Sequence, residues 1–260
     1  MRLPRKGRRM TDAGLVLEQM RRALVIARKD IRIYYSKGPV VIFGVLFPAF
    51  LFLSFAIGRN LSLDFMMPGL LGMVLFFTAT AISPAVAPWE TQSRTLERLM
   101  SCPVTMPTII LGDVLASFAF GVVISFIPLV VGLAMGISVS QPLLLGLGLV
   151  MAAFCFSSLG LIFSAAPAST PSTIMMLSSM VKFPVVFISG IFIPLGELPG
   201  WGRAIAFVSP LTYFTDVARH CLQESGYLPM AVDLAALLGF SILFLVLAMK
   251  LHQMTMPRRI

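Results

Sequence analysis

The feature that most constrains this chain is a run of 68 residues, 114–181, without a charged side chain. Two further uncharged runs cover residues 39–58 and 65–89. A helix crosses the hydrocarbon core of a bilayer with about 20 apolar residues, so the longest run must cross it more than once. Only 12% of the 260 residues are charged, whereas soluble domains carry about 25%. This shortage of charge excludes a soluble monomeric enzyme and predicts a polytopic membrane protein.

Turn-forming residues divide the longest run. Gly136–Pro142 (GISVSQP) and Ala166–Pro171 (APASTP) have the composition of turns. We therefore expect an all-α fold with six transmembrane helices in a single domain, residues 1–260. The expected crossings are residues 39–58, 65–88, 114–137, 142–165, 172–194 and 229–249.

The distribution of positive charge predicts the orientation. Of the 20 Lys and Arg residues, eleven lie in residues 1–37, two in the loop 89–113 and three in the C-terminal tail. Only Arg59, Arg203 and Arg219 fall in the opposite loops. Because loops rich in Lys and Arg stay in the cytoplasm, we expect both termini to be cytoplasmic in a multi-pass plasma (inner) membrane protein.

Residues 11–37 predict an amphipathic helix that lies at the membrane surface. We expect its cations to face anionic membrane lipids rather than nucleic acid, because the basic arm leads directly into apolar runs. The alternative, a helix packed on a soluble domain, lacks a domain to pack on. The cations that we assign to the lipid interface are Arg21, Arg22, Lys29 and Arg32.

Several kinds of chemistry lack their residues in this sequence. The sequence contains no GxxxxGK[ST] phosphate loop, so the chain is not expected to bind ATP by that motif. The two histidines, His220 and His252, lie outside the expected crossings, which leaves an intramembrane metalloprotease without ligands. Cys102, Cys155 and Cys221 fall in three compartments, which predicts free thiols. We expect no catalytic residue, no cofactor and no metal in this chain.

Two segments between the crossings carry motifs. In WETQSRTLERLMSCPVTMP, residues 90–100 predict one charged helix suited to contacting a cytoplasmic partner, and the alternative is a solvated linker. In SGIFIPLGELPGWGRAIAFVSPLTY, helix breakers alternate with apolar residues. We expect residues 195–228 to be an extracellular segment whose half-helices dip back into the outer leaflet. The expected outer-gate residues are Gly190, Phe192, Pro194, Pro199, Trp201, Pro210 and Tyr213.

Lys182 is the only charged residue well inside an expected crossing. A lysine at mid-span costs about 2.5–3.5 kcal/mol, which the apolar residues of the same crossing offset. We expect Lys182 to face the cavity between the two chains of a dimer or to reach a partner, where it could contact cargo, and the alternative is that it snorkels toward an interface.

Together these motifs resemble those of ABC transporter permeases of the type-2 exporter class. This sequence departs from the family pattern at three positions. Arg94 replaces the usual glycine, Cys102 replaces the usual Ser or Thr, and Ser209 replaces the usual asparagine. The cytoplasmic pattern, roughly E-x3-G-T-L-E-x-L-x-x-[ST]-P, is matched at Glu90, Thr95, Leu96, Glu97, Leu99 and Pro103. The outer pattern is matched at Ser189, Gly190, Phe192, Pro194, Leu198, Pro199, Trp201, Pro210, Leu211 and Tyr213.

The resemblance implies that the chain forms half of a transport channel. Two such chains, which we expect to be a homodimer, would pair in the membrane and dock two copies of an ABC-type ATPase subunit that holds ATP and Mg²⁺. The helix at 90–100 and the amphipathic helix would carry the motion of the ATPase to the crossings. The expected ATPase-coupling residues are Glu90, Arg94, Leu96, Glu97 and Leu99.

The composition favours a lipophilic cargo, a drug or a lipid. The chain has 21 Phe but only two Trp and four Tyr, the residues that stack on sugars. The same Phe residues would also suit contact with acyl chains. Alternative functions are export of a lipid-linked polysaccharide by the same architecture, or ion-coupled secondary transport. The second alternative has few ionisable groups to use, namely Lys182 with Asp113 and Asp233 at the ends of crossings.

Overall fold

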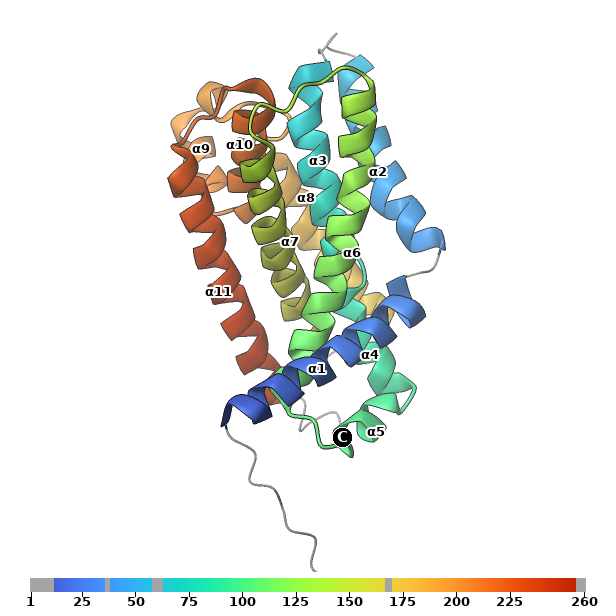
Figure 1. The fold of residues 1–260 in the computed structure, drawn as a ribbon. Helices are drawn as coiled ribbons and strands as arrows, with labels where there is room; N and C mark the ends of the chain where they lie inside the picture. The colour runs from blue at the N-terminus through green and yellow to red at the C-terminus, as the bar shows by residue number, and fades with distance from the viewer. Residues whose placement is uncertain (1–11, 36–37, 58–62, 167–169, 256–260) are drawn as a thin grey trace, which may run out of the picture.

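The computed structural model describes residues 12–35, 38–57, 63–166 and 170–255. Within these ranges all regular structure is helical, which confirms the expected all-α fold. Figure 1 shows an elongated bundle with α1 lying obliquely across one end and α9 and α10 near the other, and we call these the α1 end and the α10 end. The elements are α1 (Asp12–Asp30), the π-helix η1 (Ile31–Tyr35), α2 (Gly38–Ile57), α3 (Leu63–Ala79), α4 (Ser83–Gln92), α5 (Thr95–Met100), α6 (Met106–Ala134), α7 (Pro142–Ser164), α8 (Pro171–Ile188), the 3-10 helix η2 (Leu195–Glu197), α9 (Gly200–Ala206), α10 (Pro210–Gln223) and α11 (Met230–Thr255).

Five helical segments of the described residues are long and apolar enough to cross a membrane. The multi-pass architecture is therefore confirmed. The first expected crossing, 39–58, coincides with α2, and the total of six crossings stays a prediction. The five segments are Phe65–Gln92, Met106–Ala134, Pro142–Ser164, Pro171–Ile188 and Met230–Thr255.

The third crossing begins earlier than expected. We expected it to start at residue 114, but α6 starts at Met106 and carries Asp113 in its interior, 4% exposed. Pro107 lies in the first turn of α6, where its missing N–H costs no helical hydrogen bond. The helix ends at Ala134, and Gly136 supplies a left-handed backbone (φ 94°) for the predicted turn to α7.

A break at residues 80–82, which the sequence analysis did not predict, interrupts the second crossing. Pro84, in the first turn of α4, has no N–H to give to the carbonyl of Thr80 four residues earlier, and in a continuous helix its ring would collide with that carbonyl. The Thr80 hydroxyl donates to the carbonyl of Phe76 at 2.6 Å. The Thr80 carbonyl is thus released from the helical hydrogen-bond ladder.

The main core lies between α3, α7 and α10. Each of these helices contributes one fully buried phenylalanine, Phe76, Phe156 and Phe214, and the rings meet edge to face at centroid distances of 5.1 and 6.4 Å. Such aromatic contacts add about 0.5–1.5 kcal/mol beyond the area that they bury. Although α10 is too short to cross a bilayer, it is therefore part of the bundle core.

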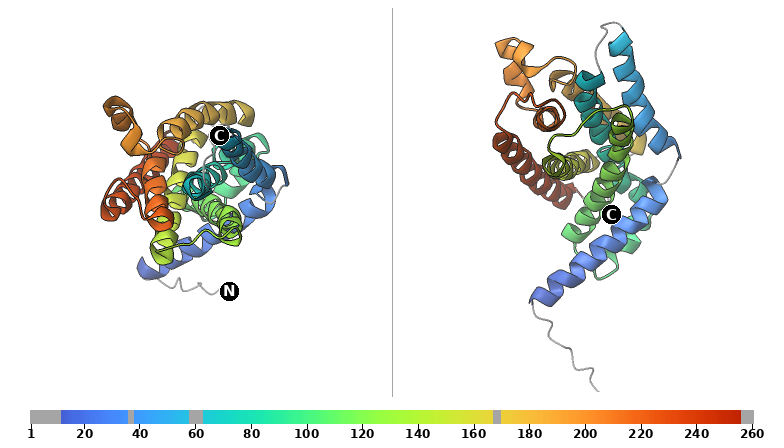
Figure 2. Two further views of the ribbon diagram at one scale, coloured as in Figure 1. Left: turned by 90° about the horizontal axis from the view of Figure 1, so that it is seen from above. Right: turned by 45° about the horizontal axis from the view of Figure 1, so that its top comes forward.

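The amphipathic helix α1 packs on the start of α6 (Figure 2). Ala23 and Ile26 are buried there, and a Cβ added to Gly112 of α6 would lie 2.7 Å from the Cβ of Ile26. The missing side chain at Gly112 thus allows the two helices to approach closely. Leu17 and Leu24 of the same helix are 73% and 58% exposed. Part of α1 therefore packs on a membrane-spanning helix, a contact that the sequence analysis did not predict.

Candidate functional site

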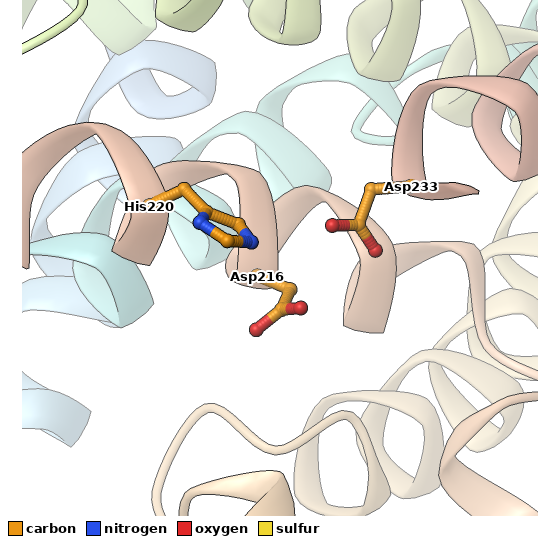
Figure 3. A group of neighbouring side chains, drawn as sticks. All are labelled: Asp216, His220 and Asp233. Atoms are coloured by element: carbon orange, nitrogen blue, oxygen red, sulfur yellow. The ribbon is translucent and has the colours of Figure 1, made fainter. Parts of the chain in front are cut away.

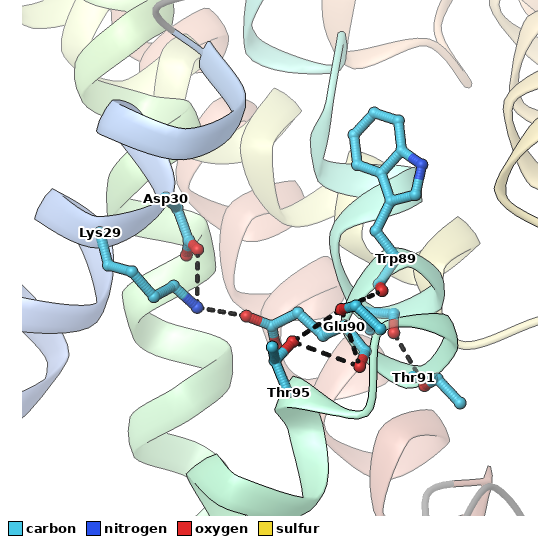
Figure 4. A network of polar contacts seen from close by, with 8 residues as sticks. Lys29, Asp30, Trp89, Glu90, Thr91 and Thr95 are labelled. Atoms are coloured by element: carbon cyan, nitrogen blue, oxygen red, sulfur yellow. Dashed lines mark hydrogen bonds and ion pairs between the residues drawn. The ribbon is translucent and has the colours of Figure 1, made fainter.

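The α1 end contains a buried charged cluster, made of Lys29, Asp30 and Glu90, with Asp113 of α6 beside Asp30. The ammonium of Lys29 lies 2.9 Å from Oδ1 of Asp30 and also forms an ion pair with Glu90 of α4 (Figure 4). Asp30 is fully buried and Glu90 is 2% exposed. Burial lowers the pKa of Lys29, but the carboxylates of Asp30 and Glu90 outweigh it and hold that pKa above its usual value. The cluster therefore contains a charged lysine that joins α1 to α4.

Ring stacking reinforces the same junction. Tyr34 of η1 and Trp89 of α4 stack with their centroids 5.5 Å apart and their planes 12° from parallel. The hydroxyl groups of Tyr35 and Ser117 lie 2.7 Å apart, which ties η1 to α6. Polar and aromatic contacts thus fasten the chain between α1 and α2 to two other helices.

Two of the four cations that we assigned to the lipid interface bind protein instead. Lys29 pairs with the buried carboxylates, and Arg22 pairs with Glu18 and donates to the carbonyl of Pro103. Carboxylates and carbonyls in a partly buried setting bind cations more strongly than solvated groups do. Arg21 and Arg32 are exposed, as the lipid-interface prediction requires.

The expected helix at 90–100 is in fact two helices. α4 ends at Gln92 and α5 begins at Thr95, because Arg94 adopts a left-handed conformation with φ 55° and ψ 22°. The hydroxyl of Ser93 donates to the carbonyl of Trp89 at 2.7 Å and that of Thr95 to the carbonyl of Glu90 at 3.3 Å. Such side-chain bonds compete with the helical ladder. The prediction of one continuous helix is therefore wrong, and Glu90 lies inside the protein with Lys29.

The five predicted coupling residues divide into buried and exposed groups. Glu90 and Leu96 are buried, and Leu96 packs with Ala87 of α4 and anchors α5 to the bundle. Arg94 and Glu97 are exposed, and Leu99 is half-buried. The charged side chains of Arg94, directly before α5, and of Glu97, within α5, therefore face away from the bundle.

An open cavity of about 450 Å³ lies between α2, the α3–α4 break and α8. Each of these three segments contributes a phenylalanine, which is its lining residue farthest from the α1 end. The ring centroid of Phe47 lies 5.2 Å from that of Phe77 and 5.8 Å from that of Phe183, and the latter two lie 6.1 Å apart. These three rings contact one another in the part of the lining nearest the α10 end. The lining is otherwise apolar except for two side chains, and it consists of Gly44, Phe47, Phe77, Ala81, Ile82, Trp89, Met175, Ser179, Lys182 and Phe183.

Lys182 turns into this cavity and is 7% exposed. Its ammonium donates to the carbonyl of Thr80 at 2.6 Å, the carbonyl that Pro84 releases from the helix. An ammonium has three donors, so two remain for other acceptors. The side chain lies among the helices of this chain, and its place on the substrate path stays a prediction.

The outer segment is held by two arginines that we had counted only as loop charges. Arg219 of α10 donates to the carbonyl of Gly190 at 2.7 Å, and Arg203 donates to the carbonyls of Leu195 and Leu198 at 3.1 and 3.2 Å. Arg203 also donates to the hydroxyl of Tyr227 at 2.7 Å. Side chains thus supply the donors that the irregular backbone between α8 and α10 lacks.

The predicted gate residues occupy different depths. Gly190, with φ 75°, and the side chains of Phe192 and Pro210 are buried. Tyr213 is half-buried and donates to the carbonyl of Phe207 at 2.8 Å. The remaining three lie toward the surface: Pro194 is half-buried, and Pro199 and Trp201 are exposed.

Sequence reasoning missed the acidic partners at the α1 end. Asp30 is adjacent to Lys29 in sequence, but Asp113 lies far along the chain in an apolar run. The available signal was the isolated charge of Asp113 within a stretch that otherwise reads as a crossing, since such a charge requires a partner.

Comparison with known proteins places this chain among membrane transport proteins. Residues 20–222 match the family described as ABC-2 type transporter. Daunorubicin resistance ABC transporter permease protein DrrB1 of Streptomyces coeruleorubidus is 25% identical over 209 residues, which cover 77% of this chain and 72% of that protein. Inner membrane transport permease YadH of Escherichia coli (strain K12) is 24% identical over 192 residues, which cover 74% of this chain and 75% of that protein. The family match extends from within α1 to α10 and includes both the charged cluster and the cavity.

Proposed function

This chain belongs to the ABC-2 type transporter family and is a membrane permease subunit, and on that premise we propose that it exports a lipophilic cargo with energy from a separate ATPase subunit. ATP and Mg²⁺ would be held by that partner. The absence of a phosphate loop from the sequence supports this division. We further propose that two copies of the chain form a homodimer with two ATPase subunits.

The observation that carries the proposed coupling is the exposed charged surface of α5. A pair of exposed charges on a helix stabilises the folded state by only about 0.2–0.5 kcal/mol. Stabilisation of the fold therefore does not explain why these charges are present on α5. Complementary charge instead sets partner choice and register at an interface. We propose that Arg94 and Glu97, with the half-buried Leu99, contact the ATPase, while Leu96 holds α5 against the permease wall.

The charged cluster gives a route for motion from α5 into the bundle. α5 follows α4 after a two-residue link, and α4 is joined to α1 through Glu90 and Lys29. α4 also continues into the break at residues 80–82, whose carbonyl binds Lys182. A displacement of α5 would therefore act on α1 and on the cavity through direct contacts.

The cavity supports a lipophilic cargo with a hydrogen-bond acceptor. Its phenylalanine rings would contact an apolar body, and the two remaining donors of Lys182 would bind a neutral or anionic polar group. A single tryptophan, Trp89, lines it, which fits poorly with the ring stacking that a sugar path uses. The related protein named for daunorubicin resistance is consistent with a drug as cargo.

We also propose that the α1 end faces the cytoplasm. The excess of Lys and Arg at this end of the sequence supports that orientation. The cavity would then open toward the cytoplasmic half of the membrane, and the rings of Phe47, Phe77 and Phe183 would separate it from the exterior.

Co-purification with the cognate ATPase tests the assembly. We expect the isolated chain to hydrolyse no ATP and the complex to contain two permease chains and two ATPase subunits. ATP hydrolysis should rise when daunorubicin or a fluorescent short-chain phosphatidic acid is added to the reconstituted complex. Robust hydrolysis by the permease alone would overturn the proposal, and a failure of both probes would overturn the lipophilic cargo.

A further inference from the structure

Three side chains of metal-ligating type meet at the α10 end, far from the charged cluster. Asp216 and His220 belong to α10 and Asp233 to the first turn of α11, and one ligand atom from each lies within 4.8 Å of the others (Figure 3). The four-residue spacing of Asp216 and His220 places them on the same face of α10. Figure 3 shows Asp233 facing them from the neighbouring helix.

Asp233 is the member of this group whose polar neighbour among the described residues is another carboxyl group, that of Asp216. The residue is fully buried, and within the described part of the chain neither of its carboxylate oxygens has a hydrogen-bond donor. A buried carboxylate without a donor or a counter-charge costs several kcal/mol. Its nearest acidic neighbour, Asp216, is itself only 2% exposed, so repulsion adds to that cost. The site therefore lacks positive charge.

The two ligands on α10 are held in place by the loop before α11. The carboxylate of Asp216 accepts hydrogen bonds from the backbone N–H groups of Tyr227, at 2.9 and 3.1 Å, and Leu228, at 2.8 Å. Nε2 of His220 lies 2.6 Å from the carbonyl of Leu228. A side chain at Gly226 would overlap the imidazole ring. The N–H groups that bind Asp216 orient its carboxylate in the way that outer contacts orient the ligands of metal sites. Because a carbonyl only accepts, Nε2 of His220 is the donor to Leu228, which leaves Nδ1 as the unprotonated nitrogen of the ring.

We propose that Asp216, His220 and Asp233 bind a divalent transition-metal ion, for which Zn²⁺ is the best candidate. An imidazole nitrogen with two carboxylates suits zinc, whereas Ca²⁺ and Mg²⁺ prefer sites made of oxygen alone. Three protein ligands leave one position of a tetrahedral zinc ion for water. The ion would supply the positive charge that Asp233 lacks and would tie α10 to α11.

This linkage would act on the outer segment. α10 is the helix that Arg219 connects to the carbonyl of Gly190, so fixing α10 to α11 also fixes the turn after α8. We expect bound Zn²⁺ to raise the thermal stability of the protein and to slow any movement of α10 relative to α11.

The experiment is a Zn²⁺ titration of the full chain, reconstituted with its ATPase partner and stripped of metal with a chelator. A Cys102→Ser background removes the exposed thiol of Cys102 as a competing ligand. Calorimetry gives the stoichiometry, and Co²⁺ absorption reports ligation directly. We expect one ion per permease chain and a higher unfolding temperature with Zn²⁺.

The variants Asp233→Asn and His220→Gln should weaken Zn²⁺ binding by more than about 100-fold, since even the loss of an outer contact costs about 10–100-fold. Glu224→Gln, at an exposed acid of the same loop, is the matched control and should bind as the parent does. Two variants are used so that a folding failure of one leaves the other informative. Absence of stoichiometric binding by the parent, or equal binding by both ligand variants, would overturn the site.

Discussion

Lys29 of α1 forms an ion pair with Glu90 of α4, and the two residues lie 61 positions apart in the sequence. Lys29 also pairs with Asp30, so this single ammonium compensates two buried carboxylates. This ion pair connects α4, and with it α5, to α1, the helix that lies across the α1 end.

The two members of this pair should differ in their effect on stability. Lys29→Met leaves Asp30 and Glu90 buried without a cation, and we expect a loss of about 3–5 kcal/mol. Glu90→Gln leaves Lys29 paired with Asp30, and we expect a loss of only about 1–2 kcal/mol. The unfolding midpoints of the purified variants in one detergent measure the order. Equal losses, or a larger loss for Glu90→Gln, would contradict the cluster as we describe it.

The backbone at Arg94 predicts an unusual tolerance. A left-handed conformation costs an ordinary residue about 1–2 kcal/mol but costs glycine nothing, whereas glycine loses about 0.5–1 kcal/mol more backbone entropy on folding. Arg94→Gly should therefore be neutral or stabilise the chain by up to about 1.5 kcal/mol. Arg98→Gly, inside the right-handed α5, is the matched control and should cost about 1 kcal/mol. If both substitutions destabilise alike, Arg94 is not left-handed in solution.

Replacement of two glycines by alanine should change the stability of the protein in opposite directions. Gly112 lies at the close contact between α1 and α6, whereas Gly146 faces open space. Gly112→Ala would force Ile26 away from α6, and overpacking of this kind costs about 1–3 kcal/mol. Gly146→Ala lies in α7 with nothing within 4 Å of the added methyl, and it should stabilise the helix by about 0.5–1 kcal/mol. Thermal unfolding of the two variants gives the comparison. A stable Gly112→Ala protein would mean that α1 is not packed as described.

Lys182 provides a test of the cavity. Lys182→Met preserves the volume of the side chain but removes the donors, and we expect it to fold, insert and transport with altered rate or selectivity. Lys182→Arg keeps a charged donor and should retain more of the parent's activity. Uptake of daunorubicin and of the fluorescent phosphatidic acid into proteoliposomes is the measurement. Unchanged transport by Lys182→Met would remove Lys182 from the substrate path.

The sequence predicted the helices and their principal turns because the responsible signals are local. Uncharged runs and the turn at Gly136 require no knowledge of distant residues. The break at residues 80–82 also had a local signal, the proline four residues after Thr80, but the high apolar content of the run concealed it. Here the hydrogen-bond rule for proline was more informative than hydropathy.

The contacts between distant segments could not be predicted in the same way. Helical periodicity places Lys29 on a polar face, but it does not distinguish a lipid headgroup from Glu90 as its partner. Likewise the spacing of Asp216 and His220 indicates a shared face, while Asp233 joins them only because α11 returns beside α10. Partners of buried charges depend on topology, which a single sequence determines only indirectly.

The rate of substrate-stimulated ATP hydrolysis in proteoliposomes tests the central claim, that α5 couples this permease to a separate ATPase. Glu97→Lys reverses an exposed charge on α5, and Glu197→Lys makes the same change at an exposed position near the α10 end. We expect both variants to insert and fold. Glu97→Lys should lose stimulated hydrolysis and co-purification of the ATPase, while Glu197→Lys keeps both. Stimulated hydrolysis at the unmodified rate in Glu97→Lys would contradict the account and make α5 a solvated linker.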